Sequence, residues 1–156
     1  MNEEYMKIAN DLALENAENN FKDGGPFGAI IVLDNKIIGK GKNSCIVNHD
    51  PTAHAEISAI RDACKNLNTH DLTNAVIYTS TYPCPMCLSA IIWANIKTVY
   101  YGNTKEDAAS IGFRDNDIYE FIKNNKKNVL ETKNISRELT IKTFELFDKN
   151  TDKIMY

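Results

Sequence analysis

Residues 75–102 read AVIYTSTYPCPMCLSAIIWANIKTVYYG and predict the core of the architecture. The first six residues are rich in β-branched and aromatic side chains, which is typical of a strand. Pro85 suits the first position of a helix, where a backbone N–H has no partner in any case. We therefore expect a strand over 75–80, a helix over 85–95 and a strand over 97–102. The helix is apolar nearly all round, which predicts burial on most of its sides.

The residues before this stretch predict a helix, a hairpin and a second helix. Helical spacing of apolar residues covers 4–20, and Asp34-Asn35 is a two-residue link suited to a hairpin between 27–33 and 36–42. Asp50 and Thr52 are candidate caps of the next helix. Its buried stripe is expected to contain Ile57, Ile60, Cys64 and Leu67.

The residues after 102 predict helices over 104–111, 116–123 and 136–149. Helices that alternate with strands after an opening hairpin indicate an α/β fold, a three-layer α/β/α sandwich with a mixed central sheet. The length of 156 residues suits one domain over 1–156.

The composition excludes several classes of function. A net charge of −3 provides no overall field to attract nucleic acid, which makes it an unexpected partner. The acidic start is unlike a signal peptide, and no apolar stretch is long enough to cross a bilayer, so we expect a cytoplasmic protein with no membrane partner. In a reducing compartment the four cysteines are not expected to form disulfides.

The chemistry is concentrated in His54-Ala55-Glu56 and, 27 residues after Glu56, in Pro83-Cys84-Pro85-Met86-Cys87. A helix that begins at Pro85 places Cys84 at its cap and Cys87 one turn later, where unpaired backbone amides favour thiolates. His54 also falls near a helix start. Three such ligands predict a Zn²⁺ cofactor with a fourth position left for water, the arrangement of a catalytic site.

Glu56 is expected to be the catalytic acid and base rather than a ligand, because residues two apart on a helix point in nearly opposite directions. Two other interpretations stay open at this point. A structural zinc site would need a fourth ligand from Cys45 or Cys64. A thioredoxin-like redox pair also uses C-x-x-C before a helix, but it has no use for His-x-Glu.

With these motifs the chain resembles the cytidine-deaminase superfamily and is most similar, within it, to the bacterial guanine deaminases. The resemblance covers about residues 5–122. It includes residues 24–29 (GGPFGA), residues 50–56 (DPTAHAE), residues 83–87 (PCPMC) and residues 112–113 (GF), together with the terminal Tyr156. It implies a zinc-dependent hydrolase of purine metabolism that converts guanine and water into xanthine and ammonia.

The resemblance also implies the residues that bind the base. Polar contacts are expected from Asn43, Asp115 and Tyr156, a contact from Ala55, and packing against the flat ring from Phe27 and Trp93. From the residues alone, Phe27 and Trp93 could equally belong to the core, Asn43 could end a strand, and Asp115 could cap a helix. The family further implies a homodimer that exchanges a C-terminal segment of about 129–156. The polar loop at 123–128 is the expected hinge, since exchange needs a connector that can extend.

Two positions depart from the pattern of the guanine deaminases, namely Tyr82 and Arg114. The alternative functions are deamination of tRNA adenosine, or of another free base or nucleoside, and a non-catalytic zinc module. For the tRNA alternative, residues 123–153 hold eight Lys and Arg against five Asp and Glu, a modest basic excess.

Overall fold

The computed structural model describes residues 2–124 and 129–155. The chain divides into two compact units, residues up to 116 and residues from 117, and each unit is described by itself. Tyr156 and most of the expected hinge, residues 125–128, lie outside the described residues.

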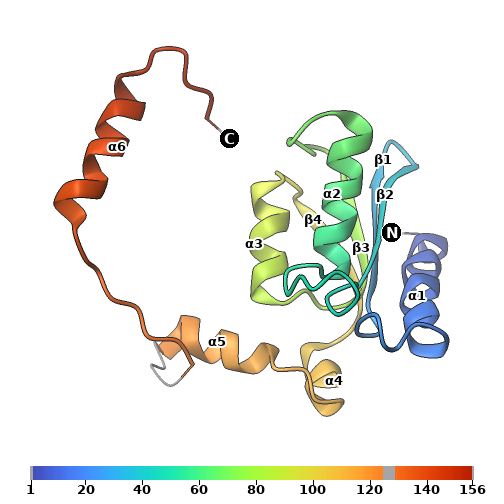
Figure 1. The fold of residues 1–156 in the computed structure, drawn as a ribbon. Helices are drawn as coiled ribbons and strands as arrows, with labels where there is room; N and C mark the ends of the chain where they lie inside the picture. Colours follow the sequence, from blue (N-terminus) through green and yellow to red (C-terminus); the bar gives the residue numbers. More distant parts are fainter. Residues whose placement is uncertain (1, 125–128, 156) are drawn as a thin grey trace. The chain divides into compact units, whose positions relative to one another are not determined.

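The first unit is built on a four-stranded sheet with the order β2-β1-β3-β4 (Figure 1). The strands are β1 (Gly28–Leu33), β2 (Lys36–Lys42), β3 (Val76–Thr81) and β4 (Thr98–Asn103). Strand β1 is antiparallel to β2 and to β3, whereas β3 and β4 are parallel. The prediction of a mixed central sheet is therefore confirmed.

The hairpin between β1 and β2 turns at the predicted two residues. Asp34 and Asn35 both have positive φ, 48° and 60°. Asn and Asp tolerate this left-handed conformation, which is the one required by the tight hairpin turns that match strand twist. Local turn chemistry thus sets the register of the first two strands.

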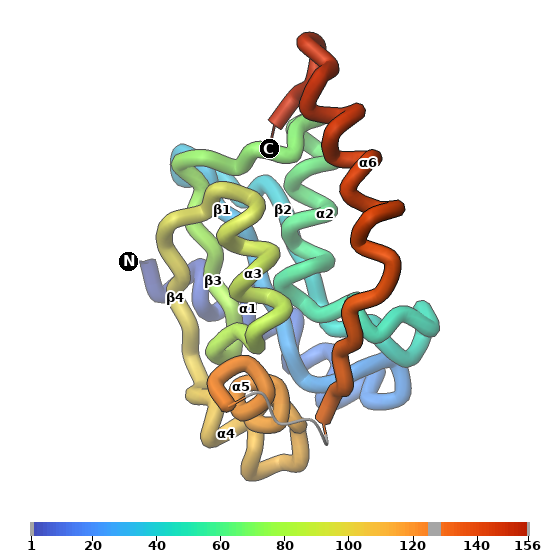
Figure 2. Tube along the Cα trace, turned by 90° about the vertical axis from the view of Figure 1, so that its left-hand side faces the viewer, coloured from blue at the N-terminus to red at the C-terminus, as the bar shows by residue number. Residues whose placement is uncertain are grey.

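Helices cover both faces of the sheet. Helix α1 (Glu3–Glu18) lies on one face, and α2 (Ala55–Leu67) and α3 (Pro85–Trp93) lie on the other (Figures 1 and 2). Because side chains alternate along a strand, Ile30 of β1 belongs to the apolar cluster under α1, and Ile31 to the cluster under α2 and α3. This arrangement confirms the three-layer α/β/α sandwich.

The start of α2 differs from the prediction. Its N-cap residue is His54, not Asp50 or Thr52. Asp50 instead stabilises the preceding turn, since its Oδ1 accepts hydrogen bonds from the backbone N–H of Thr52 at 2.8 Å and from the hydroxyl of Thr52 at 2.6 Å. Asp50 and Thr52, the two residues that resemble a cap signal, therefore stabilise a turn three to five residues before the helix begins.

The buried face of α2 also differs. Its buried residues are Glu56 and three small residues, Ala55, Ala59 and Ala63, while Leu67 at the end of the predicted stripe is exposed. Of that stripe, Ile60 and Cys64 pack against the core but are only partly buried. The reason is close packing on β2, where Gly41 has no room for a Cβ against the backbone of Ala55 and Ala59.

Helix α3 begins at Pro85 as predicted and ends at Trp93, two residues early. Its buried residues are Pro85, Cys87 and Ile91, whereas Ile92 and Trp93 are 71% and 64% exposed in the single chain. The prediction that this apolar helix is buried on most sides is therefore wrong for its C-terminal end.

The remaining helices follow the sequence pattern closely. Helix α4 (Lys105–Ser110) is capped by Thr104, and α5 (Asp115–Asn124) begins at the end of the first unit. In the second unit α6 (Arg137–Lys149) has no buried residue. None of the helices in the described residues combines the length and apolarity that crossing a membrane requires.

Candidate metal centre and adjoining cavity

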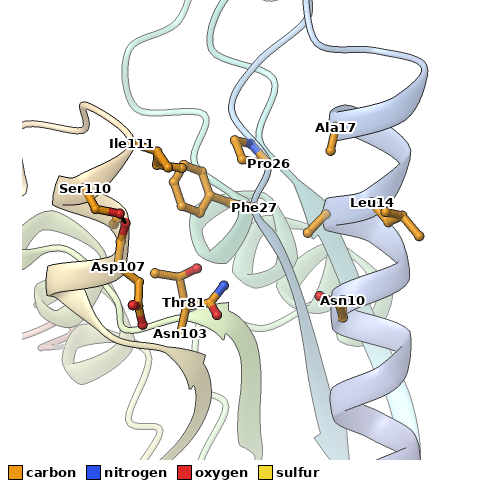
Figure 3. A pocket seen from close by; sticks show the side chains of 12 residues that line it. Asn10, Leu14, Ala17, Pro26, Phe27, Thr81, Asn103, Asp107, Ser110 and Ile111 are labelled. Atoms are coloured by element: carbon orange, nitrogen blue, oxygen red, sulfur yellow. Dashed lines mark hydrogen bonds between the residues drawn. The ribbon is translucent and has the colours of Figure 1, made fainter.

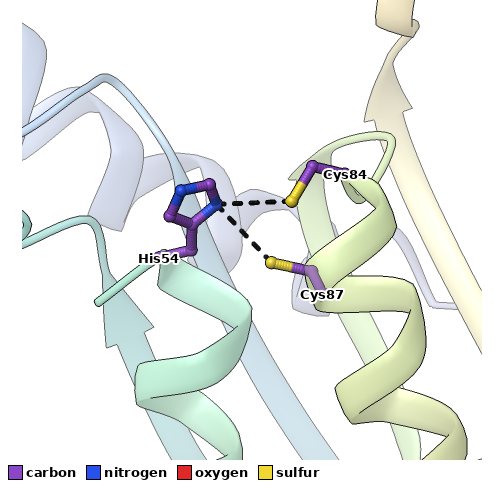
Figure 4. A group of neighbouring side chains, drawn as sticks. All are labelled: His54, Cys84 and Cys87. Carbon is purple, nitrogen blue, oxygen red and sulfur yellow. Dashed lines mark hydrogen bonds between the residues drawn. The ribbon is translucent and has the colours of Figure 1, made fainter. Parts of the chain in front are cut away.

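Two helix N-termini meet at a group of three metal-binding side chains. His54 is the N-cap residue of α2, and Cys84 is the N-cap residue of α3 with Cys87 in its first turn. The Nδ1 atom of His54 lies 3.6 Å from each of the two sulfur atoms, and the three donor atoms lie within 4.8 Å of one another (Figure 4). The predicted ligand group is therefore assembled by the fold.

The donor set and its spacing fit zinc. Tetrahedral zinc with bonds of about 2.3 Å to sulfur and about 2.1 Å to nitrogen separates these donors by about 3.6 Å. Neither Cys45 nor Cys64 joins the group in the part of the chain that the structure describes, and all four cysteines are free of disulfides. A structural site closed by a fourth cysteine and a disulfide between the two thiols both lack support.

The three donors adjust one another's protonation. The hydrogen bond from Cys87 is the main cause that lowers the pKa of the Cys84 thiol to about 4, and the same bond raises the pKa of Cys87. The hydrogen bond with Cys84 raises the pKa of His54. Cys84 is therefore the thiol that ionises first, as a cation ligand at a helix N-terminus should.

Glu56 lies next to this group and is 6% exposed. Its Oε1 accepts a hydrogen bond from the hydroxyl of Thr79 at 3.0 Å, and its Oε2 lies 3.4 Å from the sulfur of Cys87. Burial raises the pKa of the Glu56 carboxyl, because the charged form loses its hydration. A carboxyl group with a raised pKa beside a metal site is suited to exchange protons near neutral pH.

Thr79 is a residue of this site that the sequence prediction missed. It is 1% exposed, and its hydroxyl has two acceptors, Glu56 Oε1 and the carbonyl of Thr81 at 3.1 Å. A signal was present, since Thr79, Ser80 and Thr81 are successive hydroxyl side chains in a strand that is otherwise apolar. Buried hydroxyl groups need partners, and here one partner is a carboxylate.

A cavity of about 40 Å³ adjoins the metal-binding group. It is lined by the side chains of six residues, which are Phe27, Asn43, His54, Glu56, Phe113 and Asp115. The expected base-binding residues Phe27, Asn43 and Asp115 thus surround one space. Asp115 is partly buried, and this burial raises its pKa.

Asn43 is held in one orientation. It is 5% exposed, and its Oδ1 accepts hydrogen bonds from the backbone N–H groups of Gly25 at 3.3 Å and Cys45 at 3.2 Å. Since these donors require an oxygen, the side-chain NH₂ is the group left to meet a ligand in the cavity.

Ala55 and Trp93 do not line this cavity. Ala55 is fully buried and packs into the core. Trp93 is the last residue of α3, about 13 Å along the helix axis from Cys84 at 1.5 Å per residue. This position is too far for packing of Trp93 against a base in the site of its own chain.

Phe27 separates the cavity from a larger one. Its ring meets that of Phe113 edge-on, with centroids 4.6 Å apart at 76°. On its other side lies a cavity of about 370 Å³ between α1 and α4, where Pro26, Thr81 and Asn103 also lie (Figure 3). A change in the orientation of Phe27 would therefore change the size of both spaces.

The two departures from the family pattern lie outside the cavity lining. Tyr82 is partly buried and packs edge-on against Tyr101, with centroids 5.0 Å apart. Arg114 is exposed. Neither residue is among those that line the 40 Å³ cavity in the described chain.

Comparisons with known proteins agree with this geometry. The model of the zinc-binding region of cytidine and deoxycytidylate deaminases matches residues 1–103. Guanine deaminase of Bacillus subtilis is 50% identical over 120 residues, 77% of this chain and 76% of that protein. The X-ray structure of guanine deaminase from Bacillus subtilis is similar with a TM-score of 0.92 and 41% identity, covering 100% of this chain and 99% of that one. A tRNA-specific adenosine deaminase of Buchnera aphidicola subsp. Schizaphis graminum is 39% identical over 147 residues, 94% of this chain and 93% of that protein.

Proposed function

Because the chain belongs to the cytidine and deoxycytidylate deaminase family, which has a zinc-binding region, we propose that it hydrolyses the amino group of free guanine and releases xanthine and ammonia. The observation that carries this proposal is the buried carboxyl group of Glu56, 3.4 Å from the sulfur of Cys87 and open to the cavity that Asn43 and Phe27 also line.

His54, Cys84 and Cys87 would hold the zinc ion, which supplies the Lewis acidity that makes water a nucleophile near neutral pH. Glu56 performs the proton transfers. It accepts a proton from the attacking water and passes it to the ring nitrogen beside the amino-bearing carbon. It then takes the proton of the hydroxyl group newly bonded to that carbon and delivers it to the departing amine, so that the hydroxyl becomes the carbonyl of the product. The balance is one water consumed and one ammonia released for each base.

Thr79 steadies Glu56 during these transfers. A hydroxyl that donates to Oε1 favours the ionised carboxylate, the form that accepts the first proton. Burial acts in the opposite direction. Burial is the larger cause, so the pKa of Glu56 is raised overall, and the Thr79 hydroxyl limits this rise.

The base is recognised by the other residues of the cavity. Asn43 donates its NH₂ to an acceptor atom of the purine, Asp115 meets a polar edge, and Phe27 packs against the ring. The cavity of about 40 Å³ is well below the range of about 300–1,000 Å³ usual for ligand pockets. The rings of Phe27 and Phe113 form part of its wall, so a movement of either ring would enlarge it.

The direct test is ammonia release by the purified, zinc-loaded protein from a panel of free purines, pyrimidines, nucleosides and tRNA. The expected result is the highest kcat/KM with guanine, with xanthine as the product. A protein that keeps its zinc but releases ammonia from none of the free bases would contradict the proposal.

Deamination of adenosine in tRNA is the second candidate, favoured by one observation, the similarity to a tRNA-specific adenosine deaminase over 94% of the chain. That similarity is weaker than the 50% identity to a guanine deaminase. An enzyme acting on tRNA must contact phosphates, so its binding falls steeply with salt. Inosine formed only in tRNA, with salt-sensitive binding, would favour this candidate.

A homodimer that exchanges the segment of about 129–156 is the assembly we propose. In support, Ile92 and Trp93 expose apolar surface at the end of α3, and α6 exposes Leu139 and Phe144 while it buries no residue. Apolar helix faces of this kind are usually covered by a partner. Light scattering gives the mass of the assembly, and removal of residues 150–156 should weaken turnover of guanine without loss of zinc. A monomer with full activity after this truncation would contradict the exchange.

The cytoplasm is the location we propose for this activity. Cys45, Cys64, Cys84 and Cys87 are all free of disulfides, which is the usual state of cysteines in the reducing cytosol. Fractionation of cells that express the protein would test this location, and recovery outside the cytoplasm would contradict it.

A further inference from the structure

Asn16 is a polar residue in an unexpected place. It is 0% exposed on the face of α1 that packs against the sheet, where the other buried residues of the helix are Ala9 and Ala13. Asn forms helices less well than Ala, and its amide loses hydration on burial. A favourable interaction must therefore offset both costs at this position.

That interaction comes from one half of the amide. Asn16 Nδ2 donates to the carbonyl of Gly25 at 2.9 Å and to the carbonyl of Asn43 at 2.7 Å. Its Oδ1, in contrast, is the buried side-chain atom without a hydrogen-bond partner among the described residues. Since Oδ1 forms no hydrogen bond there, the two bonds donated by Nδ2 are the interaction that offsets the cost of burying an amide at position 16.

The two acceptors belong to the two segments that wall the cavity beside Glu56. Asn43 N–H donates to the carbonyl of Phe27 at 3.0 Å, and Gly25 N–H donates to Asn43 Oδ1 at 3.3 Å. Both segments thus carry residues that line the cavity. Helix α1 runs beside the segment of Pro26 and Phe27 (Figure 3), so an amide on this helix can reach both.

The Gly24-Gly25 turn packs so closely against its neighbours that neither glycine has room for a side chain. A Cβ at Gly24 would overlap the side chain and the backbone of Asn43, and one at Gly25 would overlap the rings of Phe27 and Phe113. The turn is therefore pressed against Asn43. Loss of the Asn16 bonds would remove the amide donor of the buried Asn43 carbonyl and leave the Gly25 carbonyl with the N–H of Phe27 at 2.9 Å, so that the turn and Asn43 can shift.

We propose that Asn16 is a positioning residue for base recognition. It joins the Gly24-Gly25 turn to Asn43 so that the Asn43 NH₂ points into the cavity. This inference rests on the proposed function, in which Asn43 donates to the purine. Asn16 touches neither the base nor the metal, so it acts through Asn43.

The test compares Asn16→Ala and Asn16→Leu with an exposed control, Asn66→Ala. Asn66 Nδ2 also donates to a backbone carbonyl, that of Ile38 at 2.9 Å, but this pair lies outside the cavity lining. Zinc content and the unfolding midpoint are measured for each variant before kcat and KM for guanine. We expect both Asn16 variants to retain zinc and to raise KM about tenfold, the value of one hydrogen bond to a ligand, while Asn66→Ala leaves KM unchanged.

A double-mutant cycle distinguishes positioning from a general loss of stability. If Asn16 acts through Asn43, Asn16→Ala has little further effect on kcat/KM in the Asn43→Ala background. Independent effects that multiply would overturn the inference, and so would an unchanged KM in a folded Asn16 variant. Failure of both Asn16 variants to fold would also overturn it, because Asn16 would then be a residue of the fold and not of recognition.

Failure of the proposed function gives a different result. If the wild-type protein releases no ammonia from guanine, the proposed substrate is wrong, and the same cycle is measured on the base that the panel identifies. With that base, effects of the Asn16 and Asn43 substitutions on kcat/KM that do not multiply support the inference. Effects that multiply overturn it.

Discussion

Replacement of Thr79 by Val tests how the protein controls its proton-transfer group. Val has nearly the shape of Thr, so the buried site keeps its packing while Glu56 loses the hydroxyl that donates to Oε1 at 3.0 Å. The lost bond favours the ionised carboxylate. Its removal therefore raises the pKa of Glu56, and the base form required for the first proton transfer becomes scarcer at low pH.

The magnitude follows from the geometry. A hydrogen bond to a charged group contributes about 1.5–3 kcal/mol. Because Thr79 has one hydroxyl proton and the carbonyl of Thr81 competes for it at 3.1 Å, we take the lower value. About 1.4 kcal/mol changes a rate tenfold. We expect kcat/KM to fall about tenfold on the acidic side of the pH profile and to approach the wild-type value on the alkaline side.

The assay is ammonia release from guanine over a series of pH values, with zinc content measured in each preparation. Thr79→Ser is the matched control, since it keeps a hydroxyl at the same position and should keep the wild-type profile. The reasoning would be refuted if folded, zinc-loaded Thr79→Val protein loses kcat/KM at low pH over the same pH range as the wild type. An equal loss of kcat/KM at every pH would indicate instead that the substitution disturbs the packing of the buried site.

Three further predictions concern the site and its support. Glu56→Gln should retain zinc but lose at least ~100-fold in rate, the usual contribution of a positioned acid and base; full activity would remove Glu56 from the mechanism. Phe27→Ala joins the two cavities and removes the contact with Phe113, so KM for guanine should rise about tenfold; an unchanged KM would show that the ring does not pack on the base. Asp50→Asn should lower the free energy of unfolding measured with urea at pH 7. The hydroxyl of Thr52 lowers the pKa of Asp50 below 3.8, so the difference in the free energy of unfolding between variant and wild type should narrow as pH falls below 3.8. A difference that stays constant would show that the charge of Asp50 does not cause it.

The sequence predicted those parts of the fold and site that depend on local chemistry. Pro85 predicts the start of α3 with Cys84 as its cap, and Asp34 with Asn35 predicts the hairpin, because each residue acts on its own backbone. The start of α3 and the hairpin need no knowledge of which segments meet in space. The metal-binding group was predicted from the residue types of two separate motifs, although His54 meets the two cysteines of α3 only in the folded chain.

The features that were missed depend on contacts between distant segments. The first cap of α2 was misplaced because Asp50 has the chemistry of a cap but serves a turn. The alanine face of α2 was missed because its burial depends on the glycines of β2. Asn16 contacts Asn43 across 27 positions of the chain, and no local pattern marks such a pair.

The position of the reacting groups follows from how closely α2 approaches the sheet. Gly39 and Gly41 of β2 lie against the backbone of the helix, with no space for larger side chains. The same helix carries His54 at its cap and Glu56 in its first turn. Because close-packed interiors resist compression, this contact limits where His54 and Glu56 can lie relative to the cysteines of α3. The small residues of α2 and β2 are therefore a requirement of the metal centre as much as of the core.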